Sequence, residues 1–153
     1  GVYRMNADGA NVQWIPIPFA SAVHPYKAVD DPNILFDSEQ NDSVGVYTFN
    51  LSDSTVRLLI NRDGIDNLPS YFPNLSEVLF QSTVDGNWEV YKMNHDGSSP
   101  INLSNNPADD EYSFVSPDGK SICFHSNRTG NWEVFLMDAT GLNQRRLTFS
   151  NRE

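Results

Sequence analysis

The side chains that could do chemistry in this chain are mostly carboxylates, and they lie on polar segments between short apolar runs. Carboxylates attract cations and basic protein segments, so a positively charged partner would suit them. The candidates for contact with a partner are Arg62, Asp63, Asp85, Asn87, Asp109, Asp110, Arg128 and Asn131. The alternative interpretation is a solvated rim of loops.

Metal binding needs ligands that the fold gathers at one place. The histidines His24, His95 and His125 fall at different positions of the internal repeat set out below, so the repeat does not bring them together. The run 109–111, Asp-Asp-Glu, lacks the spaced ligands and the glycine of an EF-hand loop. We therefore predict no metal site and no cofactor.

No arrangement typical of covalent catalysis is recognisable. The Gly-x-Ser-x-Gly segment of serine hydrolases does not occur. The only cysteine, Cys123, falls at a repeat position otherwise held by Leu35 and Leu79, so we predict a small buried apolar side chain there. Acids are numerous enough that a carboxylate pair of the glycosidase kind stays open. No residue is assigned a catalytic role.

The balance of charge argues against two classes of partner. The 153 residues include 20 acidic and 10 basic side chains, for a formal net charge of −10. Nucleic acids and anionic membranes both attract basic surfaces, so we expect neither as a partner. No apolar run is long enough to insert across a membrane, and a single cysteine allows no intrachain disulfide.

A repeat of 44 residues organises the chain. The segment Asn87-Trp88-Glu89-Val90 returns 44 positions later as Asn131-Trp132-Glu133-Val134. Stepping by the same distance gives the sets Val2/Val46/Val90, Ile34/Val78/Ile122, Leu35/Leu79/Cys123 and Phe36/Phe80/Phe124. A fixed period near this length indicates an array of one supersecondary unit.

Each unit reads as four short strands separated by turns rich in Gly, Pro, Asn and Asp. No segment of about ten or more residues has helical periodicity. The strands expected in the full units are 25–29, 34–36, 44–49 and 56–60, then 69–72, 78–81, 88–93 and 101–103, then 112–115, 122–124, 132–137 and 145–148. Two more, 2–5 and 12–15, precede them, and a polar loop is expected over 39–42.

Four antiparallel strands in about 40 to 45 residues are typical of one blade of a β-propeller. We therefore predict an all-β fold, a single partial propeller domain over 1–153 with about three and a half blades. The blades are 25–68, 69–112 and 113–153, and 1–24 is a half blade that holds only a third and a fourth strand. Open blade faces and a free strand edge are poorly tolerated, so we expect a fragment of a longer propeller, or a homodimer that covers these ends.

Several repeated residues are predicted to be structural. Trp88 and Trp132 would pack between neighbouring blades, each with an indole N–H that needs a partner. Asp66 and Asp110 share one repeat position, and such a residue usually caps backbone N–H groups of a loop. A core layer from blade to blade is expected from Phe36, Phe80 and Phe124.

The motifs resemble those of the TolB-like β-propeller repeat family. They are Met93-Asn94-His95-Asp96-Gly97, Ser116-Pro117-Asp118-Gly119-Lys120, Asn127-Arg128-Thr129-Gly130-Asn131-Trp132-Glu133-Val134 and Arg145-Arg146-Leu147-Thr148. By its period the resemblance covers the whole chain, and it is strongest in the last two repeats. The chain departs from the family where the first strand usually has a tryptophan, since Lys27, Tyr71 and Val115 stand there.

The resemblance implies a periplasmic or extracellular, non-catalytic scaffold that binds a protein partner on one loop-rich face. That face carries the loops between second and third strands and the loops between blades, where the candidate residues lie. The alternative is part of an enzyme, because related repeats form the gating propeller of prolyl-oligopeptidase-type peptidases and other propellers are carbohydrate-active lyases or hydrolases. A third alternative is a purely structural array without a complete site.

Overall fold

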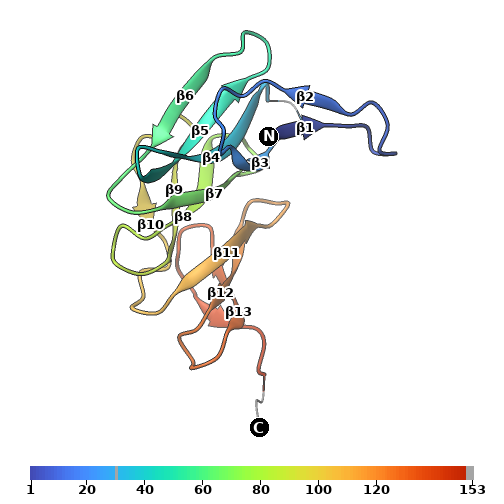
Figure 1. Cartoon of the computed structure of the whole chain (residues 1–153). Coiled ribbons are helices and arrows are strands. Elements are labelled where there is room, and N and C mark those ends of the chain that lie inside the picture. Colours follow the sequence, from blue (N-terminus) through green and yellow to red (C-terminus); the bar gives the residue numbers. More distant parts are fainter. Residues whose placement is uncertain (30, 151–153) are drawn as a thin grey trace.

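The computed structural model describes residues 1–29 and 31–150, and this part of the chain contains β-strands and no helix. The strands form antiparallel sheets that follow one another along the chain. Figure 1 shows them in succession, from the N-terminal hairpin in blue to the C-terminal sheet in red. The predicted all-β fold with four-stranded antiparallel sheets is confirmed.

The first sheet is a hairpin, and the next three sheets have four strands each. The hairpin pairs β1 (Val2–Arg4) with β2 (Gln13–Ile15). The second sheet contains β3 (Val23–Tyr26), β4 (Asn33–Gln40), β5 (Ser43–Asn50) and β6 (Val56–Ile60). The third contains β7 (Asp66–Tyr71), β8 (Glu77–Ser82), β9 (Glu89–Asn94) and β10 (Ile101–Asn102). The fourth contains β11 (Asp110–Val115), β12 (Ser121–Ser126), β13 (Glu133–Asp138) and β14 (Arg145–Arg146). Strands pair in chain order, as in a propeller blade.

A tight turn joins the two longest strands. β4 and β5 pair along their whole lengths, and only Asn41 and Asp42 lie between them. Both have left-handed backbone, with φ of 53° and 63°. Two such residues form a type I′ turn, whose twist matches that of a hairpin and which Asn and Asp tolerate. The loop predicted over 39–42 is therefore too long, because Glu39 and Gln40 continue β4.

Apolar side chains pack between successive sheets. Three core clusters lie in the described residues, and each joins neighbouring sheets. The phenylalanine of the second strand faces the preceding sheet in each case, and none is more than 1% exposed: Phe36, Phe80 and Phe124. Full burial of one such side chain stabilises the fold by roughly 1.5–3 kcal/mol.

Two burials predicted for the last sheet differ from the structure. Cys123 is half-buried, and Trp132 is 49% exposed. The core takes Ile122 and Phe124 from β12, so Cys123 between them faces the opposite side, against which no described sheet packs. At the equivalent position in the third sheet, Leu79 is 1% exposed because the fourth sheet covers it.

Every first strand begins earlier than predicted and contains a β-bulge. The pairing register shifts between Val23 and Tyr26 in β3, and β7 and β11 have the same irregularity one and two repeats later. The residue inside each bulge has left-handed backbone: His24, Leu68 and Tyr112, with φ of 46°, 52° and 50°. A bulge turns side chains away from the regular alternation of a strand.

The preceding sheet holds each of the later bulges in place. The Leu68 N–H donates to Asp37 Oδ1 at 3.0 Å, and the Tyr112 N–H donates to Gln81 Oε1 at 3.0 Å. Asp37 and Gln81 stand 44 residues apart on β4 and β8 and are 2% and 4% exposed. One buried acceptor per sheet therefore fixes the position of the next sheet.

Candidate functional site

The first strands of three successive sheets meet along one surface. Each lies at one edge of its sheet, and β3 packs against β7. Together β3, β7 and β11 line a cavity of about 210 Å³. We call this surface the inner wall, and it consists of residues 24–26, 68–70 and 112–114.

The inner wall is rich in exposed rings. Tyr26, Tyr112 and Phe114 are 38%, 52% and 65% exposed, although all lie on strands that pair within a sheet. The Tyr112 ring lies 5.8 Å from that of His125, which the neighbouring strand β12 supplies. Exposed aromatic side chains that share one cavity are a common means of holding an apolar or cationic group.

A histidine and a buried carboxylate meet at one end of the inner wall. His24 Nδ1 lies 2.9 Å from Asp37 Oδ1, and the same oxygen accepts the Leu68 N–H. Burial raises the pKa of the Asp37 carboxyl, and His24 and the Leu68 N–H oppose that shift. With Nδ1 bonded to Asp37, Nε2 is the ring nitrogen of His24 that remains for a further hydrogen bond.

Arg62, one of the candidate partner-binding residues, is bound inside the fold. Its guanidinium lies 2.8 Å from Asp66, and its backbone N–H donates to the same carboxylate at 3.1 Å. The guanidinium also lies 4.4 Å from the ring centre of Tyr91 and 5.5 Å from that of Phe80. Asp66 thus binds the backbone N–H of a loop residue as well as a side chain.

Arg128 makes the equivalent set of contacts one sheet later. Its guanidinium lies 2.7 Å from Asp110 and donates to Gln144 at 2.7 Å. It covers the rings of Phe124 and Phe135, at 5.4 and 4.8 Å. Burial raises the pKa of the Asp110 carboxyl, and hydrogen bonds from Ser126 and the charge of Arg128 oppose the shift.

Other candidate residues also hold the loops together. Asn87 donates to the carbonyl oxygens of Asn106 and Ala108, at 2.9 and 2.7 Å. Asp109 accepts the Trp88 N–H at 3.2 Å and is bonded to the Asn127 amide at 3.2 Å. Through these contacts, the Asn87 and Asp109 side chains stabilise the conformation of the loops.

Three candidates remain at the surface of the loop face. Asp85 is exposed and accepts hydrogen bonds from the Tyr91 hydroxyl and, at 2.9 Å, from Asn102. Asp63 is exposed and Asn131 is half-buried. Asp63 and Asp85 are therefore the charges of this set that are most available to a partner.

The structure gives a further role to the glutamate of the repeated Asn-Trp-Glu-Val segment. Glu89 is 2% exposed and accepts hydrogen bonds from the Ser104 hydroxyl, from the Asn106 N–H at 2.9 Å and from Asn87 at 3.1 Å. Burial raises the pKa of Glu89. This carboxylate ties the third strand to the segment that leads to the next sheet.

The equivalent Glu133 does the same in the last sheet. It receives hydrogen bonds from the Ser150 N–H at 2.8 Å, from Arg146 at 2.6 Å and from the Thr148 hydroxyl. These donors, Ser150 and Thr148 foremost, lower the pKa of Glu133 to about 2. The sequence did show an acid at the same repeat position in both third strands, followed each time by a valine and an aromatic residue.

The described residues contain no group of three or more His, Cys, Asp or Glu side chains placed to hold a metal ion. They also contain no helix with the length and apolar character needed to cross a membrane. The groups that the structure does bring together are the rings of the inner wall, the His24–Asp37 pair and the two buried Arg–Asp pairs.

Successive four-stranded sheets whose first strands share one wall define an array of β-propeller blades. Residues 1–153 match the family model described as TolB beta propeller domain, and the chain belongs to this family. A search of curated proteins finds no match.

Solved structures support the same assignment. TolB from Acinetobacter baumannii has 25% identity and a TM-score of 0.80, over 96% of this chain and 37% of that one. A protein assigned as TolB from Agrobacterium tumefaciens has 19% identity and a TM-score of 0.77, over 84% and 49%. This chain thus spans less than half the length of either protein.

An enzyme also shares the fold. A puromycin-hydrolyzing peptidase from Mycobacterium tuberculosis has 13% identity and a TM-score of 0.75, over 94% of this chain and 24% of that one. At this identity the likeness concerns the fold alone. Propeller blades of this kind therefore occur both in TolB proteins and in an enzyme.

Proposed function

We propose that the chain is a non-catalytic binding module that holds a protein partner at the inner wall and at the loop face beside it. The observation that carries this proposal is the shared cavity of β3, β7 and β11, which is lined by side chains from three repeat-equivalent bulges. We also propose a periplasmic or extracellular location, which rests on the family resemblance.

The bulges support a role of the inner wall in binding a partner. Bulky residues such as Leu68 and Tyr112 rarely adopt left-handed backbone, and each such residue costs about 1–3 kcal/mol. The strain recurs at one repeat position, where buried acceptors on the preceding sheet bind the strained N–H groups. The same feature that aligns the sheets thus shapes the wall that a partner would contact.

The net charge of the chain and the size of the cavity indicate which kind of partner segment would fit. The chain carries a net charge of −10, and Asp63 and Asp85 lie exposed on the loop face. A cavity of about 210 Å³ has room for one or two side chains. We therefore propose an extended protein segment that presents an aromatic or aliphatic side chain to the wall and basic residues to the acidic loops.

Enzyme function is the other hypothesis, because a peptidase shares the fold. The inner wall favours binding: its cavity is lined by rings, prolines and serines, with His24 as its one ionisable group besides the tyrosines. A His–Asp pair can act as a general base, but a catalytic assignment would need a reacting group positioned beside it.

A library of random twelve-residue peptides displayed on phage tests the proposal. Peptides selected on the chain should be enriched in basic residues with an apolar anchor. The best peptide should bind Phe114→Glu at least roughly tenfold more weakly than the unaltered chain, because a charge would enter the apolar cavity. Leu142→Glu is the control, since Leu142 is 66% exposed, as Phe114 is 65% exposed, but lies outside the inner wall.

Equal binding to the unaltered chain and to Phe114→Glu would overturn the proposal. So would a selection that yields no binding peptide. Circular dichroism of both variants, with unchanged β-sheet spectra, ensures that lost binding reports on the surface and not on misfolding.

A further inference from the structure

The outermost strand of the second sheet is long for its place in the fold. The fourth strands lie at the outer edges of their sheets, and Figure 1 shows β6 at the margin of the molecule. β6 has five residues, Val-Arg-Leu-Leu-Ile, whereas β10 and β14 have two each. Native proteins usually keep edge strands short or charged, because a long apolar edge invites another strand to pair with it. β6 therefore offers a template for pairing that the other two outer strands lack.

The pairing register indicates which main-chain groups of β6 face outward. The Asn50 N–H donates to the Thr55 carbonyl oxygen at 2.9 Å, so these residues form a hydrogen-bonded pair. Hydrogen-bonded and non-hydrogen-bonded pairs alternate along an antiparallel ladder. The register thus puts Val56 and Leu58 in non-hydrogen-bonded pairs with β5. Both residues therefore direct their N–H and C=O groups towards the outer edge.

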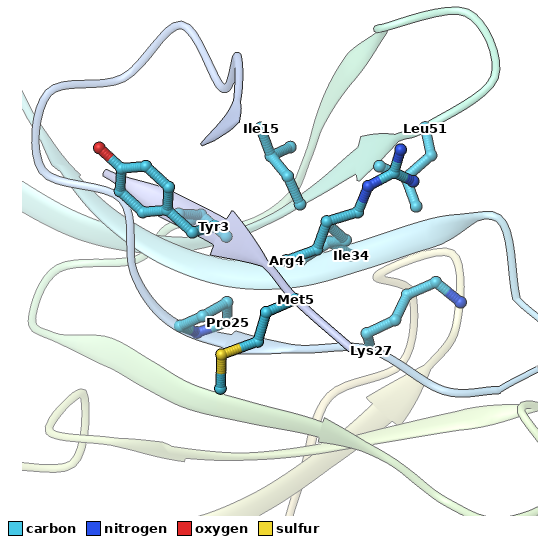
Figure 2. A pocket seen from close by; sticks show the side chains of 9 residues that line it. Tyr3, Arg4, Met5, Ile15, Pro25, Lys27, Ile34 and Leu51 are labelled. Carbon is cyan, nitrogen blue, oxygen red and sulfur yellow. The ribbon is translucent and has the colours of Figure 1, made fainter. Parts of the chain in front are cut away.

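Leu58 adds an apolar side chain to this edge. It lies opposite Tyr47, which belongs to the core cluster between the hairpin β1–β2 and the second sheet. Figure 2 shows part of that contact, where Ile15 from the hairpin and Ile34 from β4 line one cavity. Leu58 itself is 49% exposed, so it extends the apolar surface of the cluster to the outer edge. An apolar residue of an added strand would pack on it.

The third sheet holds β6 in place from the other side. Arg57 Nη2 donates to the Asp96 carbonyl oxygen at 2.9 Å, on the turn between β9 and β10. Gly97 on the same turn lies so close to the Leu59 carbonyl group that a Cβ would not fit there. Leu59 also packs on the core cluster between the second and third sheets. The edge is thus preorganised, which reduces the entropy lost when a strand is added.

An open cavity of about 510 Å³ continues from Leu58 past the end of β6. The Arg62 guanidinium borders it but is bound by Asp66 at 2.8 Å. The rest of its lining supplies mostly amide, hydroxyl and carboxylate groups, from Gln40, Asn41, Ser43, Asn61 and Asp63. Amide oxygens and a carboxylate accept hydrogen bonds from an ammonium or guanidinium group. The cavity therefore suits a Lys or Arg side chain.

Exposed acids flank β6 at both ends, Asp53 before it and Asp63 after it. Hydrogen bonds from the Thr55 hydroxyl and N–H lower the pKa of Asp53, so this acid is ionised at neutral pH. A second copy of this chain, paired antiparallel along β6, would bring Asp53 of one copy towards Asp63 of the other at both ends. Like charges oppose such a dimer, whereas a strand with basic residues at its ends is attracted.

We propose that the outer edge of β6 binds an extended, basic segment of a protein partner by strand addition. The main chain of the segment pairs with Val56 and Leu58, one apolar side chain packs on Leu58, and a Lys or Arg enters the cavity beside Asp63. In strand addition, main-chain hydrogen bonds supply affinity and side-chain pockets supply specificity. This site uses no residue of the inner wall and shares only Asp63 with the loop face.

A short labelled peptide tests the proposal. The sequence Lys-Thr-Val-Thr-Val-Thr-Lys, with blocked ends and a fluorescent label, alternates as a strand does and has a cation at each end. Anisotropy should show saturable binding that weakens with added salt. The matched peptide with Glu at both ends should bind at least roughly tenfold more weakly. Leu58→Lys should weaken binding of the lysine peptide by roughly tenfold, because a cation would replace the apolar contact. Ile101→Lys, at a residue 52% exposed on β10, is the control and should bind like the unaltered chain.

Methylation of peptide amides tests the pairing itself. Strand addition engages every second amide of the added strand. N-methyl groups on one alternate set of amides should abolish binding, and on the other set they should leave it unchanged. Hydrogen exchange in the complex should slow at the Val56 and Leu58 N–H groups. Phe114→Glu, which tests the inner wall, should bind this peptide normally, so the two proposals can fail separately.

Several results would overturn the proposal. They are no binding of the lysine peptide, the same effect of both sets of N-methyl groups, or equal binding to Leu58→Lys and Ile101→Lys. Sedimentation that shows a dimer of the unaltered chain, dissociated by Leu58→Lys, would also overturn it, because a second copy would then be the occupant. Unchanged β-sheet circular dichroism of both variants ensures that lost binding does not report misfolding.

Discussion

Arg62 and Arg128 occupy equivalent places in neighbouring sheets although they come from different positions of the 44-residue repeat. Arg62 precedes the sheet that it joins, whereas Arg128 follows the second strand of its own sheet. Each guanidinium binds the first aspartate of a first strand, at 2.8 and 2.7 Å, and covers two aromatic rings. The same contact with aspartate is therefore made in both sheets, but by arginines from different loops.

In the second sheet, an uncharged aromatic side chain packs on the two rings that an arginine covers in the later sheets. Ala22 stands at the repeat position of Asp66. The Phe19 ring lies 5.9 Å from that of Phe36 and 5.0 Å from that of Tyr47, the rings that an arginine covers in the later sheets. Loss of the acid at this position is therefore matched by loss of the arginine.

Removal of one partner from a buried pair should be costly. We predict that Asp110→Ala lowers the free energy of unfolding by about 3 kcal/mol, since it leaves the half-buried Arg128 without its carboxylate. Urea denaturation measures this loss. Asp63→Ala, at an exposed acid of the loop face, should change stability by less than about 0.5 kcal/mol, and equal losses in both variants would contradict the account.

Replacement of a whole pair should cost less than removal of half of it. Asp66→Ala alone should destabilise the chain strongly, whereas Asp66→Ala/Arg62→Phe copies the solution that Phe19 and Ala22 provide. A double-mutant cycle should show a favourable coupling of about 1 kcal/mol or more. Additive losses would show that the aromatic substitute does not fit in the third sheet.

The repeat made the fold predictable, but it could not show which loop charges face outward. Periodicity identified the strand order and the Phe36, Phe80 and Phe124 set, because burial of one face imposes regular apolar spacing. The role of Arg128 was missed, because its partner Asp110 lies 18 residues away and its place over two rings depends on the packed sheets.

The inner wall was missed for another reason. A bulge shifts the alternation of a strand by one residue, so pattern reading gives the wrong face for residues such as Tyr112 and Phe114. The sequence did show that the apolar residues of the first strands do not alternate regularly with polar ones. The loop-rich face was expected as the binding region, but the rings along the first strands were not.

Two glycines with similar backbone should respond differently to a methyl group. Gly97 and Gly86 have φ of 87° and 98°, so Ala is strained at both by about 1 kcal/mol. A Cβ at Gly97 would lie 2.3 Å from the Leu59 carbonyl oxygen of the preceding sheet, whereas at Gly86 nothing lies within 4 Å. Thermal unfolding should show the larger loss for Gly97→Ala. A similar loss in both variants would mean that the third and fourth strands pack less closely on the preceding sheet than the structure shows.

Stability should be greatest in mildly acidic solution. Burial raises the pKa of Asp37, Glu89 and Asp110, so the folded state holds their protons more tightly than the unfolded chain does. Their contribution is present below the unfolded pKa values of about 4 and is lost as pH rises through the raised values. The pKa of Glu133, lowered to about 2, acts oppositely, and its contribution is lost as pH falls from about 4.5 through 2.

The variant Asp37→Asn isolates the contribution of the Asp37 carboxyl to this pH dependence. An amide oxygen can still accept the Leu68 N–H, as Gln81 accepts the Tyr112 N–H in the next sheet. The variant should therefore fold, and its stability should fall less steeply between about pH 4 and 7. Urea denaturation over that range measures the slope, and an unchanged slope would show that Asp37 titrates as it does in the unfolded chain.

Binding at the inner wall is tested most directly by a map of amide and aromatic chemical shifts as the best phage-selected peptide is added to the labelled chain. If the peptide binds at the inner wall, the largest shifts should fall on Tyr26, Tyr112 and Phe114, with smaller ones on the loop that carries Asp63. Shifts confined to the outer strands β6 and β10, with the inner wall unchanged, would contradict it.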